Sequence, residues 1–291
     1  MLRGPVFVGT DLSAAAGEAL RQSAGLAADL GGRLIVCHVL PELLRVNMLF
    51  PQWRGIDCAR EPSIRSKAEE AVRRHAEEIL GAPGRDVAIV LEAGTPHAGL
   101  LAAADAARAG VIITGPGRVA GEVARHASVA VLVARPSPTH GPVIGAMDFS
   151  DSSLPALNAA AAEARRRRSP LHLIHAVDVG IHMTGGARAG ALPYLEGASA
   201  IALEGLDELR AAADRRLRES LQQYAVEGQA AVVSGRAAEG IVEWAETAGA
   251  QLVVIGTHGR SGMARLALGS TASAVIERAP CSVLVVRLTP T

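Results

Sequence analysis

A glycine-rich stretch near the C-terminus has the residue types and spacing of a phosphate-binding loop. Its glycines Gly256, Gly259 and Gly269 are followed by Ser270, in the spacing G-x2-G-x9-G-S. Glycine lets the main chain approach a ligand closely, and the free N–H groups at the start of a helix attract anions. The hydroxyls of Ser270 and Thr271 can cap that helix or bond a phosphate oxygen. The spacing alone leaves open a glycine-rich surface loop that ends in a helix cap.

Positive charge accompanies these glycines. Arg260 and Arg265 lie between the second and third glycines, where a chain of phosphates would extend, and His258 lies between the first and second. A protonated His258 can contact phosphate, but we expect its backbone to make the contact. The stretch therefore favours an anionic ligand.

Other kinds of reactive site are not indicated. The nine histidines include no HxxxH or HExxH pair, and Cys37, Cys58 and Cys281 are too few and too scattered for a disulfide framework or a CxxC site. No G-x-S-x-G nucleophile elbow occurs, and the single lysine, Lys67, argues against a P-loop or Schiff-base lysine. Nothing resembles a general base that positions water for phosphate hydrolysis. We therefore expect no catalytic residue and no metal site.

The composition excludes several classes of partner. Lys+Arg and Asp+Glu both number 29, so the net charge is zero, which argues against binding nucleic acid by bulk charge. Aromatic residues make up only 2%, which disfavours base-stacking surfaces. The N-terminus has no apolar region of signal length, and no apolar window reaches the roughly 18 residues of a membrane span. We expect a cytoplasmic protein with no nucleic-acid or membrane partner.

The chain contains an internal repeat. Residues 4–20 match 141–157 and residues 34–39 match 171–176, both at an offset of 137. Residues 94–115 match 235–256 at an offset of 141, and residues 119–135 match 271–287 at an offset of 152. Four blocks in the same order with growing offsets indicate a duplicated domain with two insertions in the second copy. We predict a first copy at residues 1–138 and a second at 139–291, joined by the Pro- and Gly-rich linker 135–142.

Each copy alternates short apolar runs with helical stretches. The runs predict strands at 6–8, 34–39, 87–91, 111–114 and 129–133 and at 143–146, 171–177, 230–234, 252–255 and 283–286. Residues 66–80 and 206–224 have helical spacing. Continuous apolar runs are typical of parallel strands covered on both faces, so we predict an α/β fold of two doubly wound domains, each a five-stranded parallel sheet between helices. The loops 41–65 and 178–205 are interpreted as lid or packing segments, or as a ligand gate or partner surface.

Ligands of open α/β sheets bind beyond the carboxyl ends of the strands, so the residues that follow the strands are candidates. Asp148 follows the first strand of the second copy. It is a candidate to contact a ligand or to cap the first helix, although capping suits Ser150 or Asp151 better. His38 and His175 lie near strand ends, and we expect each to be packed or hydrogen-bonded to a loop.

The chain resembles the universal stress protein family in its tandem two-domain form. The stretches LVVIGTHGRSG and LGSTASAVIERAPCSVLVV and the first-strand segment AMDFSDSS look like the family's own, and ATP-binding members carry the pattern G-x2-G-x9-G-[ST]. The resemblance implies ATP or a related adenine nucleotide, often with a divalent cation such as Mg²⁺ on the phosphates. It implies that Asp148 contacts the nucleoside and that Ala176 lies against adenine. The full implied set is Ala146, Met147, Asp148, Ala176, Ile255, Gly256, His258, Gly259, Arg260, Gly269, Ser270 and Thr271.

The first copy lacks the phosphate loop. It keeps an aspartate, Asp11, but Gly115 and Val119 are 4 positions apart, whereas Gly256 and Thr271 are 15 apart, so 11 residues are missing. Residues 115–118 (GPGR) are predicted to close the gap as a tight turn. We expect that this copy does not bind ATP in the family's manner and has a structural role. In the family, domains pair through the last strand, which would bring 129–133 beside 283–286.

These features predict a nucleotide-binding regulator of the stress response with little or no turnover. A slow ATPase is one alternative. A protein-interaction module, with its pocket empty or holding another ligand, is a second. Because family members form dimers, both a monomer with two paired copies and a homodimer of tandem chains stay open.

Overall fold

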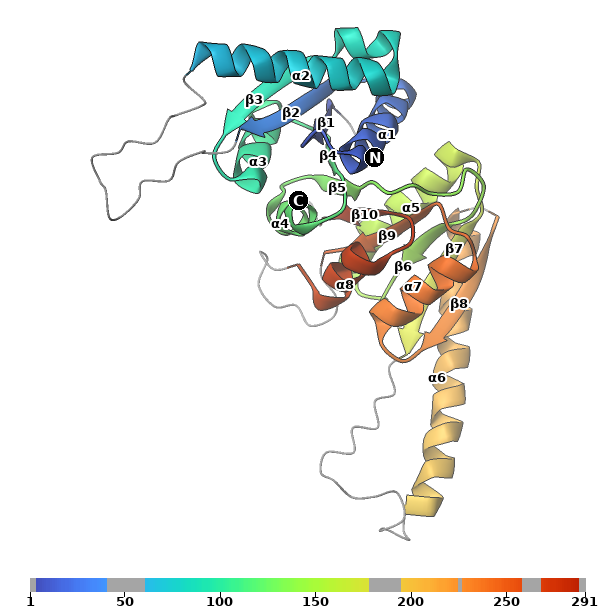
Figure 1. Ribbon diagram of the computed structural model, residues 1–291. Coiled ribbons are helices and arrows are strands. Elements are labelled where there is room, and N and C mark those ends of the chain that lie inside the picture. The colour runs from blue at the N-terminus through green and yellow to red at the C-terminus, as the bar shows by residue number, and fades with distance from the viewer. Residues whose placement is uncertain (1–3, 41–60, 178–194, 225–226, 258–267, 288–291) are drawn as a thin grey trace, which may run out of the picture.

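The computed structural model describes residues 4–40, 61–177, 195–224, 227–257 and 268–287. Ten strands in this part of the chain form one sheet between two layers of helices (Figure 1). All ten predicted strands are confirmed, with bounds that differ by at most two residues. They are β1 (Val6–Gly9), β2 (Leu34–Leu40), β3 (Ala88–Ala93), β4 (Val111–Thr114), β5 (Ala130–Val133), β6 (Val143–Ala146), β7 (Leu171–Val177), β8 (Gly228–Ser234), β9 (Leu252–Gly256) and β10 (Ser282–Val286).

The strand order is β3-β2-β1-β4-β5-β10-β9-β6-β7-β8, so each copy contributes five neighbouring strands. Neighbours within a copy run parallel, whereas β5 and β10 run antiparallel at the centre, with Leu132 opposite Leu284. The α/β architecture of two parallel halves is therefore as predicted. The antiparallel central pair also has a geometric consequence. The carboxyl ends of the strands in the first copy point to one edge of the sheet, and those of the second copy point to the opposite edge.

Two hydrophobic layers, one on each face, hold the helices to the sheet. One contains Leu20, Val72, Leu157 and Leu217. These residues belong to α1 (Ala14–Leu30), α2 (Pro62–Leu80), α5 (Leu154–Arg167) and α6 (Leu195–Tyr224). The other contains Leu100, Val123, Ile241 and Val275, from α3 (Pro96–Ala106), α4 (Arg118–His126), α7 (Ala237–Thr247) and α8 (Ser270–Arg278). Equivalent helices of the two copies thus cover the same face.

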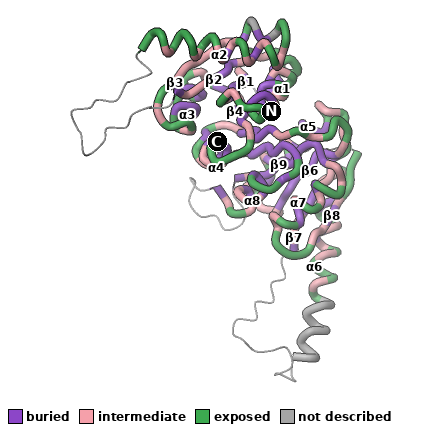
Figure 2. The backbone as a smooth tube through the Cα atoms, viewed as in Figure 1, coloured by how far each residue is buried: buried purple, intermediate pink, exposed green. Residues whose placement is uncertain are grey.

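The apolar runs form strands because both of their faces are buried. Val6, Phe7 and Val8 are fully buried, as are Val253 and Val254 of β9, and Figure 2 shows buried residues along the strands between the helices. A side chain on either face of such a strand is removed from water, so the sequence shows no alternation.

The C-terminal end of the first helix has the same geometry in the two copies. Ser13 caps α1 by accepting a hydrogen bond from the backbone N–H of Ala16 at 3.2 Å. The helix ends at Gly31, which has a left-handed φ of 61°. The equivalent residue at the end of α5 is Arg168, with a φ of 54°. The geometry of this helix end is therefore kept even where glycine is not.

Arg166 and Arg167, in the last turn of α5, are partly buried and paired. Arg166 donates to Glu163 Oε2 at 2.7 Å and also pairs with Asp29 of α1. Arg167 donates to the same Glu163 oxygen at 3.1 Å and to Gln251 at 3.3 Å. These side chains therefore tie α5 to the first copy and to the start of β9.

Two predicted loops lie mostly outside the described residues, namely 41–60 of the first and 178–194 of the second. The first loop is helical from Pro62, where α2 begins, and the second from Leu195, where α6 begins. None of the helices in the described part of the chain combines the length and the apolar character that a membrane crossing requires.

Candidate functional site

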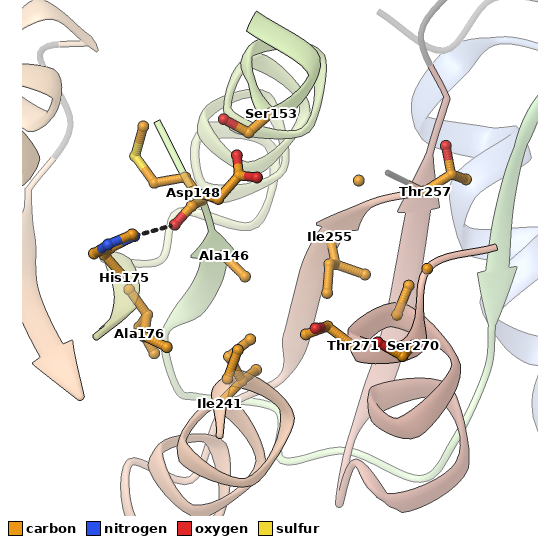
Figure 3. Close-up of a pocket in the computed structure, with 16 residues that line it drawn as sticks. Ala146, Asp148, Ser153, His175, Ala176, Ile241, Ile255, Thr257, Ser270 and Thr271 are labelled. Carbon is orange, nitrogen blue, oxygen red and sulfur yellow. Dashed lines mark hydrogen bonds between the residues drawn. The ribbon is translucent and has the colours of Figure 1, made fainter. Parts of the chain in front are cut away.

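A pocket with a cavity volume of about 180 Å³ opens beyond the carboxyl ends of β6, β7 and β9. The N-termini of α7 and α8 complete its wall (Figure 3). Nine of the twelve predicted binding residues line it: Ala146, Met147, Asp148, Ala176, Ile255, Gly256, Gly269, Ser270 and Thr271. The other three, His258, Gly259 and Arg260, lie outside the described residues. The fold therefore gathers four separated segments of the sequence at one place.

Asp148 and His175 shape one side of the pocket. Oδ1 of Asp148 accepts hydrogen bonds from the backbone N–H and the hydroxyl of Ser150, at 3.0 and 2.5 Å. Nδ1 of His175 donates to the carbonyl oxygen of Met147 at 2.8 Å. Asp148 thus organises its own turn instead of capping a helix, and Ser150 makes no side-chain capping bond to the short helix 151–153. The expectation that His175 bonds a loop is confirmed.

Phe149 braces this turn, a role that sequence reasoning missed. Its φ of 61° is left-handed, which is strained for an aromatic residue. Its ring lies 4.4 Å from the His175 ring, and the Arg216 guanidinium lies 4.7 Å above it. Ring packing and a cation–π contact stabilise the strained backbone. The equivalent residue of the first copy, Leu12, has a φ of 66°, so the turn itself belongs to the repeat.

The opposite side of the pocket is the N-terminus of α8. Figure 3 shows Ser270 and Thr271 across the pocket from Asp148. Gly269 precedes the helix and donates its N–H to the carbonyl oxygen of Thr257 at 2.8 Å, which joins the two ends of segment 258–267. A Cβ on Gly269 would lie only 3.2 Å from that oxygen, and the φ of −60° is ordinary, so close approach explains the glycine. With no side-chain cap at Gly269, the positive end of the helix dipole faces the pocket.

Apolar residues that the sequence did not single out complete the wall. Ile174 on β7 and Ile241 on α7 are almost fully buried and lie on the side of Ala176. Other lining residues outside the predicted set are Ser153, His175, Ala237, Thr257 and Ala272. Ala237 and Ile241 belong to no sequence motif. Only their position in α7, the helix that follows β8, could have indicated that they line the pocket.

The arrangement separates a polar side, an apolar side and an anion-attracting helix end. Among the described lining residues, the only carboxylate is Asp148, which lies away from α8. The described residues contain no group of three His, Cys, Asp or Glu side chains that could hold a metal ion. Such a site can hold a ligand that is apolar at one end and anionic at the other.

The first copy shows the predicted short connection. β4 ends at Thr114 and α4 begins at Arg118, with three residues between them. Gly117 precedes α4 with a φ of 131°, a conformation that favours glycine. The segment that would correspond to 257–268 is therefore reduced to a turn.

A family model described as "Universal stress protein family" matches this chain twice, at residues 3–135 and 140–287. A universal stress protein of Methanocaldococcus jannaschii is 34% identical over 140 residues, which cover 48% of this chain and 78% of that protein. Universal stress protein A homolog 2 of Coxiella burnetii is also 34% identical over 140 residues, which cover 47% of this chain and 88% of the relative.

The fold of the whole tandem chain has a counterpart among solved structures. The crystal structure of a universal stress protein from Archaeoglobus fulgidus superposes with a TM-score of 0.66 at 22% identity. The match covers 97% of this chain and 96% of that one. The two chains therefore share the arrangement of both copies.

Proposed function

This chain belongs to the universal stress protein family, and from that premise we propose that its second copy, residues 139–291, binds ATP or a related adenine nucleotide. The protein would act as a regulator of the stress response with little or no turnover. The first copy, residues 1–138, would not bind ATP in the same way.

One observation supports this proposal above all others. Residues that the family resemblance implies for nucleotide binding lie in four segments of the sequence, and the described ones line a single pocket. The apolar side around Ala176, Ile174 and Ile241 suits a purine ring, because burying such a ring removes apolar surface from water. Asp148 lies beside it, where its carboxylate can accept hydrogen bonds from sugar hydroxyls.

The phosphates would extend to the N-terminus of α8. Backbone N–H groups, the helix dipole and the hydroxyls of Ser270 and Thr271 suit an anion there. His258, Gly259 and Arg260 join the proposal through the sequence spacing alone. A Mg²⁺ ion, when present, would be held mainly by phosphate oxygens, since Mg²⁺ commonly binds substrate phosphates and keeps several waters.

Low turnover is proposed from the position of the acidic group. Hydrolysis needs a residue that orients water at the terminal phosphate. Asp148 lies on the side away from α8. A slow ATPase remains the alternative function, and it predicts phosphate release that a variant of Gly269 abolishes.

The test measures the nucleotide content and the binding stoichiometry of the full chain. We expect one adenine nucleotide per chain, either released on denaturation or bound in a calorimetric titration with ATP and Mg²⁺. Gly269→Asp places a carboxylate where phosphate would lie and should abolish binding. Gly121→Asp introduces the same charge in α4, where a Cβ at Gly121 has no atom within 4 Å, and should leave binding unchanged.

Two outcomes would contradict the proposal. Absence of nucleotide from both the purified protein and the titration would favour the protein-interaction module. Phosphate release above a buffer blank, lost in Gly269→Asp, would favour the slow ATPase.

A further inference from the structure

A second cavity, of about 320 Å³, lies in the first copy beyond the carboxyl ends of β1, β2 and β4. Because β5 and β10 run antiparallel, it opens at the opposite edge of the sheet from the pocket described above. Every residue that lines it belongs to the described part of the chain. It is therefore a separate cavity and not an extension of the first.

The polar side of this cavity repeats two hydrogen bonds of the second copy. Oδ1 of Asp11 accepts a hydrogen bond from the Ser13 N–H at 3.0 Å, as Asp148 accepts one from Ser150. Nδ1 of His38 donates to the Thr10 carbonyl at 2.8 Å, the distance of the equivalent bond from His175. The first copy has therefore kept the geometry of its aspartate turn.

The apolar side is kept as well. Val39 occupies the position of Ala176, and Leu100 occupies that of Ile241. Leu100 and Cys37, which corresponds to Ile174, are almost fully buried. The wall thus offers aliphatic surface on which a flat ring can pack.

The phosphate loop and its hydroxyl residues have not been kept, although α4 again begins without a side-chain cap and Arg118 adds a cation there. Arg118 and Val119 replace the hydroxyl residues Ser270 and Thr271 at the start of the last helix. The chain passes from Gly115 to Gly117 through a single residue, Pro116, which has no N–H to donate. A chain of phosphates leaving this cavity would enter water with no loop around it.

We propose that the cavity of the first copy binds a nucleoside that carries no polyphosphate chain. The base packs against Val39 and Leu100, and the carboxylate of Asp11 accepts hydrogen bonds from the sugar hydroxyls. This inference rests on the proposed function, because it takes the nucleoside side of the second copy as its reference. One chain would then hold two ligands that differ in their phosphates.

The experiment is a pair of calorimetric titrations on the full chain. ATP with Mg²⁺ should bind at one site per chain. Adenosine titrated into the ATP-saturated protein should then bind at one further site. Asp11→Ala should weaken this adenosine binding by about tenfold or more, the value of a lost hydrogen bond to a charged group, and should leave ATP binding unchanged. Asp148→Ala is the matched control, and it should weaken ATP binding while adenosine still binds to the first copy.

The outcomes separate the two proposals. Two ATP molecules per chain, or no adenosine binding to the ATP-saturated chain, would overturn the inference and leave nucleotide binding by the second copy standing. No ATP binding at all would overturn the proposed function. The effect of Asp11→Ala on adenosine binding would still test whether the first cavity binds a nucleoside. Thermal unfolding of both variants checks that each chain is folded. If Asp11→Ala does not fold, Asp11→Asn, which keeps an oxygen acceptor for the turn but removes the charge, takes its place and should also weaken adenosine binding.

Discussion

Arg135 and Arg287 occupy equivalent positions after the two central strands, and each holds the last helix of the other copy. Arg135 donates through Nη2 to the carbonyl oxygens of Ile276 and Glu277 in the last turn of α8. Arg287 donates to those of Ala124 and Arg125 in the last turn of α4. A cation at a helix C-terminus is favourable because it faces the negative end of the dipole. The helix that begins at the proposed phosphate site is thus fastened at its far end by the first copy.

Arg135→Ala should therefore affect both stability and binding. It removes hydrogen bonds from a charged group, which contribute about 1–3 kcal/mol to the free energy of unfolding. Burial lowers the pKa of Arg135, but the side chain stays charged at neutral pH. Urea unfolding measures the loss, and ATP titration measures the effect on α8. Arg287→Ala is the matched control: it should lower stability similarly but weaken ATP binding less, since it releases α4. Equal ATP affinity in both variants would contradict this coupling.

A second prediction concerns Glu163, whose side chain is only 10% exposed and is paired with Arg166 and Arg167. Glu163→Leu removes the acceptor and leaves two partly buried arginines without it. We expect a loss of about 2–3 kcal/mol in unfolding free energy, because hydrogen bonds between charged groups are lost while Arg166 keeps Asp29 and Arg167 keeps Gln251 as partners. Asp29→Asn affects only the half-exposed partner of Arg166 and should cost about 1 kcal/mol or less. Similar losses of unfolding free energy in the two variants would contradict the prediction that Glu163 stabilises the fold more than Asp29 does.

Much of the fold was predictable because the signals were local or repeated. Continuous apolar runs such as Val6–Val8 predict buried strands, and a fixed offset of 137 relates Asp11 to Asp148. The pairing of Arg166 with Asp29 was not predictable, because no local pattern shows that Asp29 of the first copy lies beside Arg166. Ile241 was missed for the same reason, since an isoleucine in a helix looks like any core residue until the sheet places it beside Ala176.

A third prediction is a loss of stability in alkaline solution. Burial raises the pKa of Cys37 to about 12, with a contribution from Glu92. Burial also raises the pKa of Cys281 to about 11, although Arg135 and Arg167 oppose it. Both thiols have a higher pKa in the folded protein than the usual 9.0, so below pH 9 their ionisation does not lower the free energy of unfolding. That free energy falls as the pH rises from 9 through each folded pKa, because the unfolded chain loses its thiol protons first. Each thiol should then lower the unfolding free energy by about 1.4 kcal/mol per pH unit in this window.

Urea unfolding at several pH values between 8 and about 11 measures this slope. The double variant Cys37→Ala, Cys281→Ala should flatten it, because no thiol is left to ionise at those two positions. A slope that is the same in both proteins would contradict the assignment. Alkylation gives an independent check, since both cysteines are buried and should react only after unfolding.

The last prediction is a gain of function in the first copy. This prediction assumes that the first copy has lost ATP binding only through its missing phosphate loop. Replacing residues 116–118 by residues 257–270 lengthens the connection by the 11 absent residues and places Gly269 and Ser270 at the start of the helix. ATP binding should then be restored. The exchange is made on the surface, between the end of β4 and the start of α4, so the strands are untouched. Calorimetry should then show two ATP molecules per chain instead of one, and Asp11→Ala in the exchanged chain should remove the second. An exchanged chain that unfolds cooperatively but still binds one ATP would mean that Val39 or Leu100 excludes the purine. In that case the difference between the copies would lie in the walls of the cavity as well as in the loop.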